Sequence, residues 1–269
     1  MAGAAWATVI GQLVSFVISV IYLFRTKTFK LKFKSFIPDF KAFFPALKLG
    51  LSSFITQITI VIISLVCNIM LVKYGAQSVY GVNIPIALIG IESKVFTVVI
   101  NIVVGLVLGC QPIIGYNMGC KNYARIKKLY LYILTATVGV GIVFTVLFEA
   151  APDLVVSIFG EPDPEQVNPV YYWEFARKLF RIFLMFITFT CTIKMTSIFF
   201  QALGRPVLAI IASLIRDIVC FLPLVCTLPI AMGIDGCLWA APVADGIAMA
   251  VTAVLTIICF KGISRKEKM

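Results

Sequence analysis

The stretch Gly3-Ala-Ala-Trp6-Ala7 near the start of the chain is matched near its end by Gly236-Cys-Leu-Trp239-Ala240. Further on, Gln12 in the first copy is in register with Asp245 in the second, at the same offset of 233 residues. Each copy starts a long apolar run that ends in a basic segment, which predicts that both runs cross a membrane in the same direction. Parallel repeats of this kind build two-lobed transporters. The sequence therefore predicts the last helix of one lobe followed by one complete lobe, in a chain that is incomplete.

The composition is that of a membrane protein. Hydrophobic residues make up 61% of the chain and charged residues 13%, whereas soluble domains carry about 25% charged residues. Apolar stretches of about 20 residues, long enough to span a bilayer as helices, recur along the whole length. We expect an all-α membrane protein with about seven transmembrane helices, no separate soluble domain and no cleavable signal. The expected spans are Gly3–Phe24, Leu49–Val72, Ile84–Ile114, Leu129–Phe148, Leu179–Leu203, Pro206–Ile230 and Cys237–Phe260.

The basic residues fall almost entirely on alternate loops between these spans, and an acidic stretch falls on one of the others. This alternation predicts a multi-pass protein of the plasma membrane with its amino terminus outside and its carboxyl terminus in the cytoplasm. The net charge of +11 therefore points to the lipid bilayer as a partner and not to nucleic acid. The basic loops are 25–48, 121–128, Arg205 and the tail 261–268, and the acidic stretch runs from Asp153 to Glu165.

One group of cations departs from this rule. Arg177, Lys178 and Arg181 lie beside Glu174 at the expected outer face. We interpret them as an amphipathic turn that is anchored at the membrane surface by the aromatic run Tyr171–Trp173.

Enzyme chemistry finds no support in this chain. It has no histidine, and its eight cysteines show no metal-ligand spacing. Most of the cysteines sit in apolar runs, where a thiol packs as a small side chain. A glycine-rich phosphate loop and a serine-centred nucleophile elbow are also missing. We therefore expect no catalytic residue, no metal site and no cofactor.

The sharpest local motif ends the third expected span, and it reads Gly109-Cys-Gln111-Pro112-Ile-Ile-Gly115-Tyr116-Asn117-Met-Gly119. Pro112 is expected to kink the end of the helix, and Gly115 and Gly119 to permit a turn. A basic segment that starts at Lys121 follows directly. The simplest interpretation is a helix exit lined by cations that reach the membrane surface.

Taken together, the motifs of the whole chain resemble the multidrug and toxic compound extrusion (MATE) family of efflux transporters. The resemblance rests on strings in the expected order over essentially the entire sequence. These strings are Leu49-Gly-Leu-Ser-Ser-Phe54, Gln111–Asn117, Phe200-Gln-Ala-Leu-Gly204-Arg205-Pro206, Ser213-Leu-Ile-Arg216, Gly233-Ile-Asp235-Gly236 and Pro242-Val-Ala-Asp245.

The resemblance implies two six-helix lobes around a central cleft and the exchange of protons or sodium ions for drugs, mostly organic cations. Residues 1–24 would be the terminal helix of a missing amino-terminal lobe and 49–260 the six-helix carboxyl-terminal lobe. Residues 25–48 would be a basic cytoplasmic linker, and 261–269 a basic cytoplasmic tail. The alternation of phenylalanine and lysine between Phe29 and Phe36 suits a segment on anionic lipid. The missing lobe or a second copy of the chain would complete the cleft.

The chain departs from the sodium-coupled branch of the family, which carries carboxylates on the second and fifth of the present spans. At comparable places this chain has Gln57 with Ile60, and Thr192, none of which ionises. Sodium coupling through those positions is therefore in doubt. The key Asp of the proton-coupled branch belongs to a helix that has no counterpart here, so both coupling ions stay open.

Four charged residues lie inside apolar runs, where each costs several kcal/mol unless it is paired or hydrated. Lys194, Arg216 and Asp217 are about 15 Å from the expected turn at Gly204, and Asp245 is about 14 Å from the opposite face. A Lys194–Asp217 pair is predicted between neighbouring helices, and the four charges sum to zero. Arg216 and Asp217, about 100° apart on a helix, are expected to face different partners. They form either a structural ion-pair network or a site in which Asp217 or Asp245 binds a proton or a cationic substrate.

Other polar residues in the spans are weaker candidates. Gln57, Asn68 and Asn101 are candidate ligands of substrate or ion, although interhelical hydrogen bonds also explain such residues. Glu92 and Lys94 are expected at the membrane interface.

The function that these observations favour is ion-coupled antiport of drugs or other organic cations out of the cell. Two alternatives stay open: a non-transporting helical fragment or accessory half, and a lipid or polysaccharide flippase, whose cleft should carry more cations. A seven-helix receptor fits the number of spans but explains neither the repeat nor the motifs.

Overall fold

The computed structural model describes residues 2–25, 40–160, 162 and 167–267, and in these ranges the chain is helical with short turns. The all-α prediction is therefore confirmed. The chain divides into two compact units, Met1–Lys48 and Leu49–Met269. The first unit contains α1 (Ala2–Arg25) and the first turns of α2 (Phe40–Gly75). The second unit contains the rest of α2 and all later helices, and it is the part that carries the candidate site.

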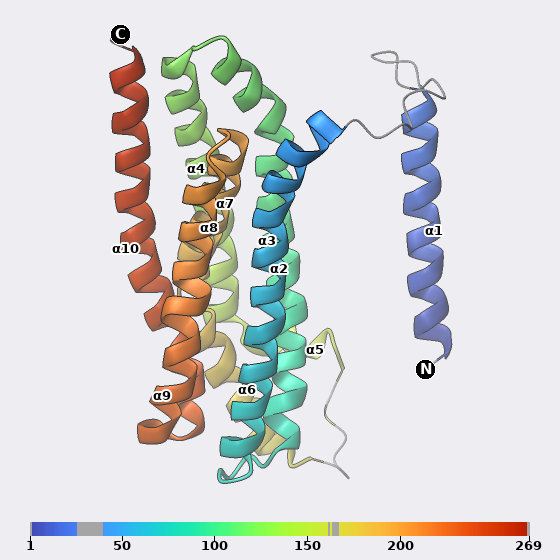
Figure 1. The fold of residues 1–269 in the computed structure, drawn as a ribbon. Helices are drawn as coiled ribbons and strands as arrows, with labels where there is room; N and C mark the ends of the chain where they lie inside the picture. The colour runs from blue at the N-terminus through green and yellow to red at the C-terminus, as the bar shows by residue number, and fades with distance from the viewer. Residues whose placement is uncertain (1, 26–39, 161, 163–166, 268–269) are drawn as a thin grey trace. The chain divides into compact units, whose positions relative to one another are not determined.

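The second unit is a bundle of long helices joined by short turns (Figure 1). Its helices after α2 are α3 (Asn83–Gly119), α4 (Tyr123–Ala150), α5 (Pro152–Ser157), α6 (Pro169–Phe183), α7 (Ile187–Ala202), α8 (Pro206–Leu214), the π-helix η2 (Ile215–Phe221), α9 (Leu222–Met232) and α10 (Ile234–Glu267).

Five helical segments of the described chain are long and apolar enough to cross a membrane, and a sixth is added if the bent pair α6–α7 counts as one span. These six correspond to the second to seventh spans expected from the sequence. The first expected span falls on α1, in which the apolar segment Val9–Tyr22 is shorter than the others. The protein is thus a multi-pass membrane protein, with five or six spans identified among its described residues.

Some helix limits differ from those expected. α2 begins at Phe40, so the end of the predicted linker is helical, while the Phe29–Phe36 segment lies outside the described residues. At the other end of the chain, α10 continues to Glu267, so most of the predicted tail extends the last helix.

The fifth expected span, Leu179–Leu203, is wrong as a single straight helix. It is broken between α6 and α7, whose axes differ by 47°. α6 starts well before the expected span, at Pro169, where the Asn168 side chain caps the helix by accepting from the Val170 N–H at 3.0 Å. At the start of α7, Thr188 packs so closely on Gly141 of α4 that an added Cβ there would lie 2.8 Å from the Thr188 Cα.

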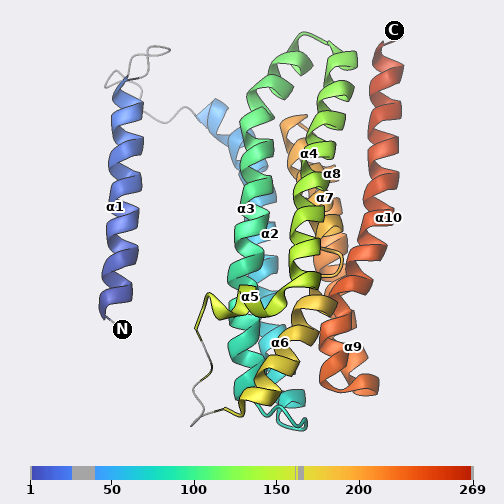
Figure 2. The same ribbon diagram turned by 180° about the vertical axis from the view of Figure 1, so that it is seen from behind.

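The loops gather at two ends of the bundle in the way that the charge alternation predicts. The α3–α4 and α7–α8 turns lie at the end where α10 finishes, whereas the α2–α3 and α9–α10 turns lie at the other (Figures 1 and 2). Two contacts fix the first end: Arg205 Nη1 lies 3.3 Å from Cys259 Sγ, and the rings of Tyr130 and Phe260 are 5.0 Å apart.

The motif Gly109–Gly119 does not turn where the sequence suggested. α3 continues through Pro112 and Gly115 and ends at Gly119. The turn follows immediately, with Lys121 in the left-handed region (φ 55°) and the Asn122 N–H donating to the Asn117 carbonyl at 2.9 Å. An unbroken helix here agrees with the need of a membrane helix to satisfy its backbone groups internally.

A close helix contact explains the Gly233–Gly236 motif. Gly233 makes the turn between α9 and α10 with φ 61°, a conformation that favours glycine. A Cβ on Gly236 would lie 2.5 Å from the backbone carbonyl carbon of Leu228. The two glycines therefore bring α9 and α10 into direct backbone contact, and this contact positions the middle of α10 beside η2.

The core of the second unit is centred on α7, most of whose residues are buried. Large aromatic side chains fill the space between α7 and its neighbours, and they are fully buried. They are Phe148, Phe175, Phe180, Phe199 and Phe200.

Candidate functional site

Three helices bring four charged side chains together in the interior of the second unit. Lys194 comes from α7, Arg216 and Asp217 from η2, and Asp245 from α10. Arg216 donates from Nε to Asp245 Oδ1 at 2.7 Å and from Nη1 to Asp217 Oδ1 at 2.9 Å. Lys194 Nζ lies 3.5 Å from Asp217 Oδ2. We call these four residues the buried charge network, and the predicted Lys194–Asp217 pair is part of it.

The network is almost closed to solvent. The side chains of Asp217 and Asp245 are each 3% exposed, and those of Lys194 and Arg216 are 16% and 14% exposed. Two cations and two carboxylates give a net charge of zero. Mutual pairing is what makes the burial of four charges tolerable, since an unpaired ion in a low-dielectric interior costs several kcal/mol.

The π-helical segment η2 carries Arg216, whose guanidinium donates to both Asp217 and Asp245. In η2 the Leu222 N–H donates to the Asp217 carbonyl, one residue further along than in an α-helix. A π-helix has more residues per turn, so consecutive side chains diverge less than the expected 100°. Arg216 and Asp217 do face different main partners, as predicted, yet they also bond to each other. The sequence carries no reliable signal for a π-helix.

Thr190 is a member of the site that the sequence did not indicate. Its Oγ1 donates to Asp245 Oδ2 at 2.7 Å, so both oxygens of this carboxylate are bonded. Thr190 stands four residues before Lys194 on α7, on the same helix face. That spacing was the one available signal, but threonine is too common in membrane helices to be singled out by it.

Glu92 is not interfacial, and this corrects the expectation. It is 4% exposed and lies nine residues after the start of α3, about 14 Å along the helix axis. Its Oε2 receives a 3.4 Å contact from Ser93 Oγ, and its Oε1 has no hydrogen-bond partner. Lys94, two residues on, is exposed as expected.

The weaker candidates do not join the buried charge network. Gln57, Asn68 and Asn101 are exposed on the surface of the second unit. Asn68 bonds within its own helix, from Nδ2 to the Ser64 carbonyl at 2.9 Å. Thr192 likewise donates to the Thr188 carbonyl at 2.9 Å. No hydrogen bond links any of these residues to the network in the described part of the chain.

The motif residues of α3 border a small hollow at the end where α10 finishes. Asn117 is buried and donates from Nδ2 to the Ile113 carbonyl at 2.8 Å, whereas Tyr116 is 70% exposed. Gln111 is half-buried, and Gly115 and Gly119 are exposed. The hollow has a volume of about 280 Å³, and it is lined by Ile113, Asn117, Arg125, Lys128, Leu129 and Tyr132.

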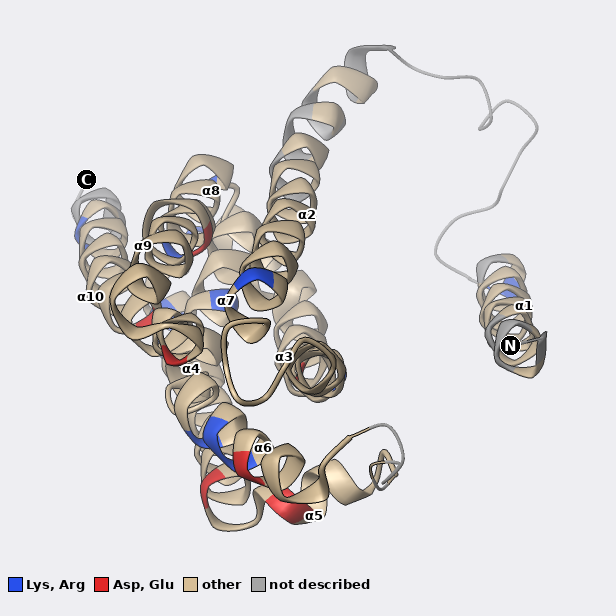
Figure 3. Cartoon of the chain, turned by 90° about the horizontal axis from the view of Figure 1, so that it is seen from below, with Lys and Arg blue, Asp and Glu red and all other residues tan. Residues whose placement is uncertain are grey.

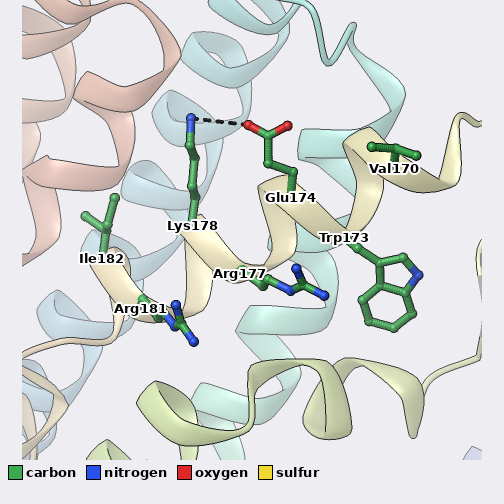
Figure 4. A pocket seen from close by; sticks show the side chains of 7 residues that line it. All are labelled: Val170, Trp173, Glu174, Arg177, Lys178, Arg181 and Ile182. Atoms are coloured by element: carbon green, nitrogen blue, oxygen red, sulfur yellow. Dashed lines mark ion pairs between the residues drawn. The ribbon is translucent and has the colours of Figure 1, made fainter.

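The opposite end carries the cations of α6 (Figure 3). They lie beside a larger open hollow of about 620 Å³ (Figure 4). Arg177 forms a two-pronged ion pair with Asp153, at 2.9 Å from Nη2. On another side of the helix, Lys178 lies 3.7 Å from Glu174 and 4.0 Å from Asp235. The predicted amphipathic character is present, but Tyr172 packs into the core instead of anchoring the surface.

Lys178 also joins Tyr80 in the α2–α3 turn. The Tyr80 hydroxyl donates to Glu174 Oε1 at 2.7 Å and accepts from Lys178 Nζ at 3.1 Å. Burial raises the pKa of the Tyr80 hydroxyl, the bond to Glu174 raises it further, and Lys178 lowers it. The resulting cluster joins α6 to the α2–α3 turn and, through the Lys178–Asp235 contact, to the start of α10.

In the described residues no three His, Cys, Asp or Glu side chains are grouped as they would be to hold a metal ion.

A family comparison decides what kind of protein carries this site. The MatE family model matches residues 52–227, which include α3, α4, α7 and the buried Arg216–Asp217 pair. The chain belongs to the MatE family. The curated relatives include the multidrug export protein MepA of Staphylococcus aureus (strain NCTC 8325 / PS 47), 24% identical over 260 residues. That alignment covers 95% of this chain and 53% of the relative, so the chain spans about half the length of that protein.

Solved structures of this class share the fold. A MOP superfamily transporter from Pyrococcus furiosus, whose binding pocket is described as having reverse polarity, aligns with a TM-score of 0.81 at 18% identity. The alignment covers 97% of this chain and 57% of that one. A MATE protein crystallised in complex with MaL6 gives a TM-score of 0.80 at 18% identity and covers 98% and 57% of the two chains. This MatE chain therefore has the fold of part of a membrane transporter, and its family is one of transporters rather than enzymes.

Proposed function

We propose that this MatE chain supplies one lobe of an ion-coupled antiporter that exports drugs and other organic cations from the cell. The lobe comprises α2 to α10 and works with an amino-terminal lobe or with a second copy of the chain. Family membership and the multidrug export function named for its relatives support the proposal. The proposed location is the plasma membrane, with the α3–α4 turn and the end of α10 in the cytoplasm, as the positive-inside rule predicts.

The observation that carries the proposal is the buried charge network. A structural bundle gains little by burying two full ion pairs, since apolar side chains of equal size stabilise a core at least as well. Charges within membrane spans are retained where ions or substrates bind. In this lobe, Asp217 and Asp245 are the carboxylates that can exchange a cation partner, and Lys194 and Arg216 are the cations that hold them when the site is empty.

The proton is the coupling ion that this chain supports better. Gln57, Ile60 and Thr192 occupy the places where the sodium-coupled branch has carboxylates, and Thr192 is bonded to its own helix. A sodium ion needs several oxygen ligands, of which carboxylates are the strongest. The buried carboxyl groups of the described lobe lie on η2, α10 and α3 instead.

A flippase for anionic headgroups is less well supported. Such a cleft requires uncompensated positive charge, yet Lys194 and Arg216 are each paired with carboxylates. An accessory half without transport activity is the outcome that would stand if the experiment below failed.

The test is a transport assay with a completed cleft. The 269-residue chain is joined in frame to the amino-terminal lobe of a MatE relative and expressed in cells that lack their own exporters. We expect lower accumulation of a cationic dye than in cells that express either half alone. Accumulation equal to that of the halves, with the fused protein folded in the membrane, would contradict the proposal. Strong extrusion by the chain alone would require a homodimer, which crosslinking would detect.

A further inference from the structure

The small hollow between α3 and α4 holds two cations that form no ion pair in the described part of the chain. We call it the α3–α4 hollow, and its lining residues are Ile113, Asn117, Arg125, Lys128, Leu129 and Tyr132. Arg125 and Lys128 are exposed, and no described carboxylate pairs with either of them. From residue 93 to residue 148 the sequence has five basic residues and no Asp or Glu. The positive charge of the hollow is therefore available to an anion from outside the chain.

Polar and apolar side chains follow one another along the hollow. Arg125, Lys128 and Tyr132 are three and four residues apart on α4, so they share one face of that helix. Tyr132 lies about 10 Å further from the α3–α4 turn than Arg125 does. Lys128 Nζ lies 5.8 Å from the centroid of the Tyr132 ring, within the range of a cation–π contact. Positive charge thus lies beside the turn, and aromatic and aliphatic surface lies deeper in the membrane.

Asn117 adds a buried polar group to the hollow. Its side-chain amide has two N–H donors, and one of them bonds to the Ile113 carbonyl at 2.8 Å. The second donor has no partner among the described residues. Asn117 is only 4% exposed, and its own carbonyl accepts from the Asn122 N–H of the turn. A fixed amide donor beside two cations is a suitable set of partners for the oxygens of a phosphate group.

The surface that continues from the hollow is open along both helices, which run side by side (Figure 2). Ile113 and Tyr132 are more than half exposed. Ile102 and Val143, each eleven residues further along the same helix faces, are exposed as well. This surface has no charged side chain between the hollow and the middle of the helices, so a hydrocarbon chain can lie on it.

We propose that the α3–α4 hollow binds the headgroup of an anionic phospholipid. Arg125 and Lys128 hold the phosphate, Asn117 donates a hydrogen bond to it, and the acyl chains lie along Ile113 and Tyr132. The volume of about 280 Å³ is below the range of about 300–1,000 Å³ for pockets that enclose drug-sized ligands, so it suits a headgroup. Basic pockets between membrane helices at the cytoplasmic side bind such headgroups. In the orientation proposed above, the lipid belongs to the inner leaflet.

Binding can be measured on the 269-residue chain in detergent by native mass spectrometry. Phosphatidylglycerol is the probe, and phosphatidylcholine with the same acyl chains is the zwitterionic reference. Arg125→Gln and Lys128→Gln should each weaken the binding of the first phosphatidylglycerol about tenfold, as expected for the loss of one charge-assisted hydrogen bond. The binding of phosphatidylcholine should not change.

The matched control is Lys121→Gln, which removes an exposed charge from the same turn without altering the lining of the hollow. It should weaken phosphatidylglycerol binding about twofold or less, because an exposed charge is screened by salt. Equal weakening by all three variants would show a diffuse attraction to this end of the bundle and would overturn the site. Unchanged binding by both Arg125→Gln and Lys128→Gln would overturn it too. Melting temperatures without lipid verify that each variant is folded.

Two further measurements identify the occupant. Phosphatidylglycerol should raise the melting temperature of the chain, and less so in Lys128→Gln, whereas glycerol 3-phosphate should leave it unchanged. Equal stabilisation by both compounds would assign the hollow to a soluble phosphate and contradict the lipid. The same binding measurement is then made on the chain fused to an amino-terminal lobe, the two-lobe fusion. If the difference between wild type and Arg125→Gln disappears there, the second lobe covers the hollow and the proposal is wrong.

Discussion

Arg216 Nε donates a 2.7 Å hydrogen bond to Asp245 Oδ1, and this bond joins the π-helix η2 to the middle of α10. The two residues are separated by a complete helix, α9, and by the turn at Gly233. Their contact closes a network of four charges on three helices. It is the relationship on which the exchange of proton and cation would depend in this lobe.

The Lys194–Asp217 pair should show strong coupling in a double-mutant cycle. Lys194→Met and Asp217→Asn each leave a buried charge with a weakened partner, and each should destabilise the lobe by about 3 kcal/mol, the lower end for a broken buried pair. The double substitution should cost clearly less than the sum. Thermal unfolding of the detergent-solubilised chain measures this, with Lys94→Met on the exposed part of α3 as control. Additive losses would show that the pair contributes no coupling energy.

Asp245→Asn should abolish ion-coupled transport by the two-lobe fusion, because an amide exchanges no proton and holds no cation. It should also destabilise the lobe, since Arg216 keeps one carboxylate partner, Asp217, in place of two.

Thr190→Val removes only the 2.7 Å hydrogen bond to Asp245 and should lower the free energy of unfolding by about 1 kcal/mol. Dye efflux and thermal unfolding are the two measurements. Thr256→Val, on α10 like Asp245, is the transport control. Full transport by Asp245→Asn would remove this residue from the site.

Gly236→Ala should separate α9 from α10. The added methyl group would meet the Leu228–Pro229 backbone at 2.5–2.6 Å, and overpacking of this kind costs about 1–3 kcal/mol. The matched control is Gly246→Ala on the same helix, where nothing lies within 4 Å of the added carbon. We expect a lower melting temperature and weaker transport for Gly236→Ala alone. Equal melting temperatures of the two variants would show that the helices yield at no cost.

Tyr80 should make the lobe less stable at alkaline pH. Its hydroxyl has a raised pKa in the folded state, chiefly through burial and then through its bond to Glu174. The folded protein thus holds this proton more tightly than the unfolded chain does. The stabilisation is complete below the unfolded pKa of about 10 and is lost as the pH rises through the folded value. Thermal unfolding from about pH 8 to pH 11 should show this loss in wild type and in Tyr74→Phe, but a smaller one in Tyr80→Phe. An identical pH profile for Tyr80→Phe would refute the linkage.

The orientation can be read from a native cysteine. Cys120, in the α3–α4 turn, is classed as exposed, whereas the other seven described cysteines are buried or half-buried. In intact cells a membrane-impermeant maleimide should leave Cys120 unlabelled, and it should react once the cells are opened. A cysteine introduced at Ser157, at the opposite end of the bundle, should react from outside. Labelling of Cys120 in intact cells would reverse the predicted topology.

The sequence by itself determined the class of fold, the positions of most spans and the family. A membrane-spanning segment must bond its own backbone groups, so an apolar run of about 20 residues specifies a helix without reference to its neighbours. For the same reason the depths of Lys194, Asp217 and Asp245 could be calculated from helix rise alone. The Lys194–Asp217 pair followed because α7 and α8 are joined by a short turn at Gly204 and are therefore adjacent.

The tertiary structure alone decided which polar groups are buried and which partners they have. Glu92 and Thr190 became part of the interior through the packing of α3, α7 and α10, and Asn68 and Asn101 were left on the surface by the same packing. Just after the break between α6 and α7, Thr188 lies against Gly141, forty-seven residues away in the chain. The π-turn that lets Arg216 bond both Asp217 and Asp245 is a local deviation whose stability comes from those bonds. Hydropathy and helix spacing measure depth in the membrane, but they do not measure rotation about a helix axis, and rotation is fixed only when the helices pack.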